Sequence, residues 1–564
     1  MPLPIAAVFW LLILLPGALC WPCILRFVDP IPRFFICLLS SFALFTYLAY
    51  LDTLLFGVAV TLPSVWGIVC LAALWVNRGR VFRVQALWQW LQQPGSILLL
   101  GLLLVTVMIR IPPLFASILP QGYDPTNHLL LARLITVADG VPTNWLPFES
   151  VPLIYPVGLH NVMAVMNTCT IGFTVSWKVL FPVFGLLTAL GLYSLILAAT
   201  GKASAAWWGA ALYSFCTKGG SLAYYGWGGM TNQAAMCTAL AMLVLVCYIA
   251  QHGGARNTWR YCWIAGGLFA ATYLIHPHVM VAAGGMFSFI MIVAFFRYRA
   301  SSLHKVVFWS LAISCVLGSF YLAPLVSRSI HSGTQALSYL EPFIHPWEAV
   351  ISISPILIIA LLLGLPTMLR ERHGMTAFVA LLALAALLGA FCALEYAYQG
   401  IHYLVTEERS TPFLPSRFLN DAVLFMALPA GVGADWLMRR LTKRHVILAG
   451  VFAVLVLVPM PLYSVHKMCA SHAGDDEFRA LLWINDHTPP DAFIINSGTS
   501  NWVNFVCWRE TSFTPLSASE AARQSKFEKF DQIRATRPVY GIGNYPGLKP
   551  IFKAGAYSVY EVRR

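Results

Sequence analysis

Residues 97–128 read ILLLGLLLVTVMIRIPPLFASILPQGYDPTNH, an apolar run that ends in a polar loop. A backbone in hydrocarbon must satisfy its own hydrogen bonds, so an apolar run of about 20 residues favours a helix that crosses the bilayer. Residues 90–110 are therefore predicted to span the membrane. The loop behind this span, residues 111–173, holds charged and aromatic side chains at the membrane edge.

The whole chain repeats this apolar pattern. Of its 564 residues, 59% are hydrophobic and 10% are charged, and its mean hydropathy is +0.72. Soluble domains carry roughly 25% charged residues, so the composition excludes an ordinary soluble protein. We predict a mainly α fold, a polytopic transmembrane helical bundle of about 12–14 spans. The spans lie near residues 3–25, 34–52, 55–76, 90–110, 174–199, 204–218, 232–251, 261–279, 280–296, 306–327, 348–369, 375–397, 419–438 and 446–465.

The basic residues indicate the orientation of these spans. Arg78, Arg80 and Arg83 share one set of loops with most other Lys and Arg residues, and the positive-inside rule places that set in the cytoplasm. The alternation holds only if residues 155–172 do not cross the membrane, so we expect a helix on the outer surface there. The net charge of +13 is mostly this topological signal, and it predicts no nucleic-acid partner.

The chain divides into a transmembrane domain, residues 1–465, and a polar C-terminal region, residues 466–564. In the latter we expect an amphipathic helix over 475–486, a strand over 492–496 and a final strand that ends near Val562. This pattern predicts a small extracytoplasmic α/β domain. Two cysteines on the outer side, Cys469 and Cys507, are candidates for a disulfide, which the sequence leaves open.

Asp124 and His128 are the first candidates for chemistry. They are four residues apart, and Pro125 suits the first turn of a helix, which would make Asp124 its N-cap. Two interpretations stay open for this pair: a capped surface helix that carries a histidine by accident, or a carboxylate and an imidazole that work together.

Other outer loops carry further candidates. The segment YPVGLH holds Tyr155 and His160, and the segment LIHPHVM places His276 and His278 on either side of a proline turn. Ionisable groups at the edge of a membrane are costly and tend to be functional. Their gathering on one side of the membrane favours a shared site.

A glycine-rich loop, AYYGWGGMTNQAA, contains Trp227 and Asn232. It lacks the strand-loop-helix context of a phosphate-binding motif, and an aromatic face with an amide suits a sugar better. A plain turn between two spans explains it equally well. Arg409 and Arg417 precede a later span on the side that disfavours basic residues, which suggests phosphate recognition or, alternatively, snorkelling to lipid head groups.

The segments GYDPTNH and YPVGLH, with the polar C-terminal region, resemble the GT-C membrane glycosyltransferases. This superfamily includes oligosaccharyltransferases, protein mannosyltransferases, the aminoarabinose transferase of lipid A and mycobacterial arabinofuranosyltransferases. The resemblance covers the chain from about Arg110 to the end. It implies transfer of a sugar from a polyprenyl-phosphate donor, with the loop carboxylate, here Asp124, as general base and Arg417 near the lipid phosphate.

The sequence departs from this family in two respects. Many relatives carry two acidic residues in the first outer loop, whereas Asp124 stands alone here with His128 nearby. Three spans also precede the one that leads into this loop, where many relatives have none. The departures leave metal dependence open: a divalent ion is an allowed cofactor, and hydrogen bonding by the histidines is the favoured alternative.

We therefore expect a hexosyl- or pentosyltransferase of cell-envelope glycan biosynthesis, embedded in the lipids of a bacterial inner or plasma membrane. The acceptor is a glycan, lipid or protein outside the cytoplasm. The alternative is a multi-span transporter or flippase for a lipid-linked or polar substrate. A transporter more often shows an internal repeat and buries ionisable residues near the membrane midplane, and neither is evident here.

Overall fold

The structure is a computed structural model. It describes residues 2–20, 25–58, 61–78, 94–122, 124–153, 155–216, 222–251, 258–276, 278–279, 284, 301–331, 353–370, 415–470, 475–496, 502–511, 530–543, 545 and 547–562. The predicted span 375–397 lies outside these residues. The predicted span 280–296 also lies outside them, except for residue 284. Arg409 lies outside them as well.

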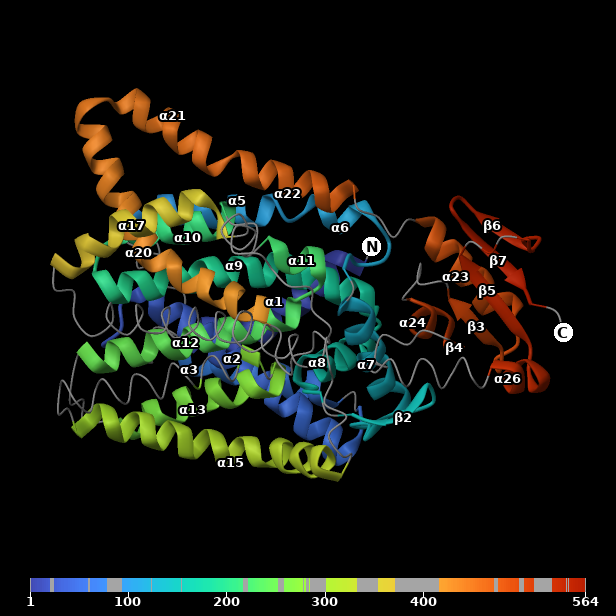
Figure 1. Ribbon diagram of the computed structural model, residues 1–564. Coiled ribbons are helices and arrows are strands. Elements are labelled where there is room, and N and C mark those ends of the chain that lie inside the picture. Colours follow the sequence, from blue (N-terminus) through green and yellow to red (C-terminus); the bar gives the residue numbers. More distant parts are fainter. Residues whose placement is uncertain are drawn as a thin grey trace, which may run out of the picture.

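The described part of the chain is a bundle of long apolar helices (Figure 1). Within it, eight helical stretches are long and apolar enough to cross a membrane, and three shorter apolar helices accompany them. The helices are α1 Pro2–Cys20, α2 Pro30–Phe56, α3 Thr61–Asn77, α5 Pro94–Met108, α9 Phe173–Thr200, α10 Ala203–Phe215, α12 Met230–Gln251, α13 Thr258–Ile275, α15 Ser301–His331, α17 Pro355–Arg370, α20 Pro415–Arg444, α21 Val446–Leu457 and α22 Pro459–Ala470. Each predicted span that the structure describes overlaps with one of these helices, although some bounds differ by several residues and the predicted span 446–465 is divided between α21 and α22. The prediction of a multi-pass membrane bundle is confirmed.

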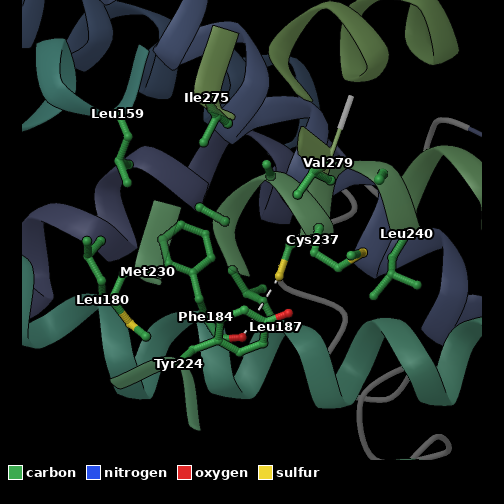
Figure 2. Packing of buried hydrophobic residues seen from close by; sticks show 14 of the residues in the cluster. Leu159, Leu180, Phe184, Leu187, Tyr224, Met230, Cys237, Leu240, Ile275 and Val279 are labelled. Atoms are coloured by element: carbon green, nitrogen blue, oxygen red, sulfur yellow. Dashed lines mark hydrogen bonds between the residues drawn. The ribbon is translucent and has the colours of Figure 1, made fainter. Parts of the chain in front are cut away.

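Helix α2 lies at the centre of the N-terminal half, where it packs against α1, α8, α9, α12 and α13. Its Phe42 ring meets Trp10 of α1 at 6.2 Å and Phe184 of α9 at 5.3 Å between ring centroids. Figure 2 shows how α9 continues this core toward α12, with Leu187 near Cys237. Most of these contacts are apolar, and one polar contact lies among them, between Sγ of Cys237 in α12 and Oγ1 of Thr188 in α9 at 3.3 Å.

A layer of short elements covers one end of the bundle. It consists of α6 Pro112–Ala116, α7 Asp124–Ala138, β1 Asn144–Trp145, β2 Glu149–Pro152, α8 Gly158–Thr168 and α11 Ala223–Trp227. Helix α8 has 11 residues, about 17 Å at 1.5 Å each, which is too short to span the bilayer. It is not a surface helix, however: Gly158–Met166 are all buried, because α2, α7, α9 and α13 surround them.

The C-terminal region forms the expected α/β domain, shown in red beyond that end of the bundle (Figure 1). Its elements are α23 Asp475–His487, β3 Phe493–Asn496, α24 Val503–Cys507, β4 Glu510–Thr511, α26 Phe530–Thr536, β5 Val539–Gly543, β6 Phe552–Ala554 and β7 Tyr557–Glu561. The strand order is β4-β3-β5-β7-β6; β3 is parallel to β4 and β5, and β7 is antiparallel to β5 and β6. The predicted helix and two strands appear within one or two residues of their expected bounds.

This domain docks on α7 through α24. The guanidinium of Arg133 donates to the carbonyl of Phe505 and lies 4.4 Å from the Trp508 ring centroid. The Trp508 ring also meets Phe148 at 4.9 Å, and Phe505 meets Phe173 at 6.2 Å. The helix that begins at Asp124 is therefore tied to the C-terminal domain about two turns later.

Cys469 and Cys507 are both free thiols, which answers the question that the sequence left open. The Cys507 thiol is buried under α23, where it donates to the carbonyl of Leu481 at 3.2 Å. Burial raises the pKa of Cys507 well above its ordinary value. Its environment is therefore that of a small core residue rather than a reactive thiol.

Candidate active site

Asp124 is the first residue of α7, one position later than an N-cap, and Pro125 follows it in the first turn. Its side chain is half-buried. The first N–H groups of a helix carry partial positive charge, so this position stabilises a carboxylate. Proline fits here because its missing N–H would have no partner inside the helix. The local sequence thus fixes a carboxylate at the helix start.

His128 lies one turn further along α7 and is buried. Its Nδ1 is 2.9 Å from Nε2 of His160, and its Nε2 is 3.3 Å from Oγ1 of Thr231. Its ring stacks on Trp177 at 5.1 Å between centroids. Both ring nitrogens therefore face protein partners, one from α8 and one from α12. The imidazole thus links α7 to these two helices one turn after Asp124.

His160 is fully buried in α8. Burial lowers the pKa of His160 to about 3, and the carbonyl of Pro156 opposes this shift only in part. The imidazole is therefore neutral near pH 7, which lets it share a hydrogen bond with His128 without charge repulsion. The Tyr155 ring lies 5.6 Å from the ring of His128 and 5.8 Å from that of His160.

The same tyrosine links this pair to the end of α13. The ring of His276 lies 6.1 Å from that of Tyr155 and 6.4 Å from that of His278. His278 in turn places Nε2 3.0 Å from Oδ2 of Asp421 in α20. A series of rings therefore runs from α7 and α8, past the residues that follow α13, to a carboxylate in α20.

The partner of His278 could not be predicted from the sequence. Asp421 is one of several polar residues that the sequence predicts on the outer side, and 143 residues separate it from His278. No spacing signals such a contact. The one available signal was the presence of a carboxylate inside an apolar span, which is costly unless it is paired.

The glycine-rich loop packs directly on the start of α7. Gly228 has φ +92°, and a Cβ added to it would lie 2.7 Å from Cγ of Pro125 and nearer still to Cδ. The backbone of the loop is thus in close contact with Pro125, the residue next to Asp124. Trp227 belongs to α11, but its side chain is outside the described residues.

Asn232 lies in the first turn of α12, next to Thr231, and is buried. Its carboxamide nitrogen and oxygen have no hydrogen-bond partner among the described residues. Buried polar atoms are nearly always satisfied in proteins, so this amide is suited to a ligand or an internal water molecule.

Two further sequence expectations concern charge. Arg417 lies in α20, one turn before Asp421, but its side chain is outside the described residues. Among the side chains that the structure describes, no group of three or more His, Cys, Asp or Glu residues is placed to hold a metal ion.

No family model and no curated protein matches this sequence. Solved structures do match the fold. Oligosaccharyltransferase AglB from Archaeoglobus fulgidus in its apo form is 12% identical with a TM-score of 0.58, over 81% of this chain and 70% of that chain. The AglB complex with an inhibitory peptide and dolichol-phosphate is 13% identical with a TM-score of 0.56, over 80% and 70% of the two chains.

ArnT from Cupriavidus metallidurans, bound to undecaprenyl phosphate, is 10% identical with a TM-score of 0.56. The match covers 82% of this chain and 97% of that chain. The chain therefore shares the fold of these AglB and ArnT structures, in agreement with the fold that the sequence resemblance implied. At this level of identity the likeness concerns the fold, and the chemistry has to be argued from the residues of this chain.

Proposed function

We propose that the protein is a membrane glycosyltransferase that moves a sugar from a polyprenyl-phosphate donor to an extracytoplasmic glycan, lipid or protein. The observation that carries the proposal is the half-buried Asp124 at the start of α7, at the bundle end where α7, α8 and α11 meet. The likeness to AglB and ArnT supports it, because their structures hold dolichol-phosphate and undecaprenyl phosphate respectively.

In this proposal Asp124 is the general base. Its carboxylate takes the proton of the acceptor hydroxyl as the acceptor oxygen forms a bond to the anomeric carbon. The bond between that carbon and the phosphate oxygen breaks, and the electron pair leaves with the lipid phosphate. Arg417, with Arg409, balances the charge that develops there.

The remaining residues orient the reactants or the base. His128 supports Asp124 without facing the substrate itself: its hydrogen bond to His160 fixes the first turns of α7, which begin with Asp124, against α8. Tyr155, Trp227, Asn232, His276 and His278 supply aromatic faces and polar atoms of the kind that hold sugars. Precise placement matters because an error of about 1 Å can cost roughly 100-fold in rate.

Asp124→Asn tests this function, since it keeps the shape of the side chain and removes the base. We expect loss of glycan transfer in a strain that lacks the native gene, with normal amounts of protein in the membrane. Asp491→Asn, an exposed carboxylate in the C-terminal domain, is the matched control. In a companion binding experiment, Arg417→Ala should weaken the binding of undecaprenyl phosphate, while Asp124→Asn should not. Wild-type glycan output from Asp124→Asn would refute the enzyme proposal.

We also propose that the active site and the C-terminal domain face outward, as the distribution of basic residues predicts. A cysteine at the exposed Lys553 should then react with a membrane-impermeant maleimide in intact cells, and a cysteine at Arg439 should react only after permeabilisation. Cys469 is replaced by Ser in both variants to lower the background. The reverse pattern of labelling would invert the proposed orientation.

A further inference from the structure

We propose that a groove between α2 and α3 binds one anionic phospholipid, with an acyl chain along the apolar walls and the phosphate at Arg26 and Arg78. The groove lies at the end of the bundle opposite Asp124, on the side that the distribution of basic residues predicts to be cytoplasmic. The inference goes beyond the proposed function, because this second site takes no part in sugar transfer.

The groove has a volume of about 470 Å³, within the range of about 300–1,000 Å³ that is usual for ligand sites. Helix α1 packs against both α2 and α3 and forms the floor. The lining includes Gly17 and Cys20 of α1, Cys37 and Leu44 of α2, and Val69 and Val76 of α3. A Cβ on Gly17 would overlap the carbonyl oxygen of Cys37 and lie 2.6 Å from the carbonyl carbon, so α1 and α2 are in backbone contact at the floor.

One end of the groove is closed where α2 and α3 meet. The ring of Phe45 in α2 lies 5.0 Å from that of Trp66 in α3, and Nε1 of Trp66 donates to the carbonyl of Leu12 in α1 at 3.0 Å. From this closure the lining extends from Leu44 back to Cys37 in α2, a length of about 10 Å at 1.5 Å per residue. An extended acyl chain fits such an elongated apolar groove.

The walls suit a hydrocarbon chain rather than a polar ligand. They are almost wholly apolar, and the hydroxyls of Ser40 and Ser41 donate to the carbonyls of Ile36 and Ile13, both at 2.8 Å. A polar ligand would lose its hydration here and find both hydroxyl protons already used. Within a bilayer, the hydrocarbon available to fill the groove is a lipid tail.

The other end of the groove carries arginines. Arg26 follows the lining residue Leu25, and its side chain is exposed. The guanidinium of Arg33, about one turn before Cys37, donates to the carbonyl of Val28 at 2.7 and 3.0 Å and so fixes the loop that carries Arg26. The connection between α1 and α2 thus holds a positive charge beside the groove.

Arg78 lies at the same end, two residues after Val76, and is exposed. Nδ2 of Asn77 donates to Sγ of Cys20 at 3.6 Å, which joins the end of α3 to the end of α1. Cζ of Arg78 lies 4.0 Å from the ring centroid of Trp75, which is 68% exposed. Exposed tryptophan is typical of the interface between membrane and water, so this end of the groove lies at the level of the lipid head groups.

The acidic residue of the connection between α1 and α2 does not cancel these arginines. Oδ2 of Asp29 accepts a hydrogen bond from the hydroxyl of Tyr248 in α12 at 2.7 Å, and α12 does not line the groove. Arg26 and Arg78 therefore present positive charge to a head group. Arginine pairs well with phosphate oxygens, and basic pockets between membrane helices on the cytoplasmic side favour anionic lipids.

Native mass spectrometry of the full-length protein in detergent tests the head-group part of the site. Phosphatidylglycerol and phosphatidylcholine with the same acyl chains are the probes. We expect one retained phosphatidylglycerol, bound about tenfold more tightly than phosphatidylcholine. Arg26→Gln and Arg78→Gln should each weaken its binding about fivefold, and the double variant about 25-fold. Arg440→Gln is the matched control and should bind like wild type, because Arg440 is likewise exposed and lies 4.2 Å from the ring centroid of Trp436, but in α20, which does not line the groove.

The acyl-chain part is tested by filling the groove. Ala72 of α3 is exposed and lines it, so Ala72→Trp should occupy the space of the chain and abolish retention of phosphatidylglycerol. Leu71→Trp is the control, since Leu71 is 66% exposed and does not line the groove. Because a ligand that binds the folded state stabilises it, phosphatidylglycerol should raise the Tm of wild type and Leu71→Trp but not that of Ala72→Trp.

Three results would overturn the proposal. Equal binding of phosphatidylglycerol and phosphatidylcholine would contradict an anionic ligand, and retention by Ala72→Trp equal to that by Leu71→Trp would place the lipid elsewhere. An equal loss of binding in Arg440→Gln would assign the effect to general surface charge. If Ala72→Trp does not fold, the comparison of the Arg26 and Arg78 variants with Arg440→Gln decides.

Discussion

Gly228→Ala should disable the site without unfolding the protein. The residue has φ +92°, where an L side chain costs about 1–2 kcal/mol. The new methyl group would lie 2.7 Å from Cγ of Pro125 and 3.0 Å from its backbone nitrogen, whereas ordinary contacts begin at 3.4 Å. Either the loop or the start of α7 must move by about 1 Å to relieve the overlap.

That movement falls on Asp124, the neighbour of Pro125. A displacement of about 1 Å at a reacting group lowers the rate on the order of 100-fold. We therefore expect Gly228→Ala to lose most glycan transfer in the complemented deletion strain. The cost of the strain, about 1–2 kcal/mol, is small enough that the protein should still elute as a folded species from size-exclusion chromatography.

Gly226→Ala is the matched control in the same loop. An added Cβ at Gly226 meets nothing within 4 Å, and alanine favours helix α11. This variant should transfer at the wild-type rate. Transfer by Gly228→Ala at the rate of Gly226→Ala would refute the idea that this close contact holds Asp124 in place.

Two further predictions follow from the buried groups around the site. Because burial lowers the pKa of His160 to about 3, the unfolded chain binds a proton below about pH 6.5 that the folded chain does not. The free energy of unfolding should therefore fall as the pH drops from 6.5 to 5, with a slope that approaches about 1.4 kcal/mol per pH unit. Thermal denaturation of wild type and His160→Gln checks this: an equal pH dependence in the two proteins would contradict a buried neutral imidazole. Arg133→Met removes the contacts with Phe505 and Trp508, and should speed amide exchange in α24 at least several-fold while β5 stays protected. Unchanged exchange in α24 would mean that the docking contact contributes little.

Much of the architecture was predictable because a single physical requirement dominates it. Apolar runs such as residues 97–109 must be helical in hydrocarbon, and their bounds are visible as changes in composition. The C-terminal helix over 475–486 was visible for a related reason, since its apolar residues recur with helical spacing. The α8 helix was predicted as a non-spanning element from charge alternation, but its burial was not, because burial depends on which neighbours surround it.

The candidate site was predictable only in its local parts. Asp124 and Pro125 specify a helix start through their own chemistry, and the sequence predicted four histidines on one side of the membrane. The sequence did not reveal that both nitrogens of His128 face His160 and Thr231. It gave no reason to single out Asp421 as the partner of His278.

The sequence by itself therefore determined a multi-pass helical bundle, a polar α/β domain at its end and a carboxylate at the start of a helix in the loop over residues 111–173. These features follow from hydrophobicity, charge alternation and helix capping, which act over a few residues. Only the tertiary structure decided which polar groups meet, because contacts such as His278 with Asp421 join segments 143 residues apart. Such contacts depend on how the helices pack, and no local pattern encodes them.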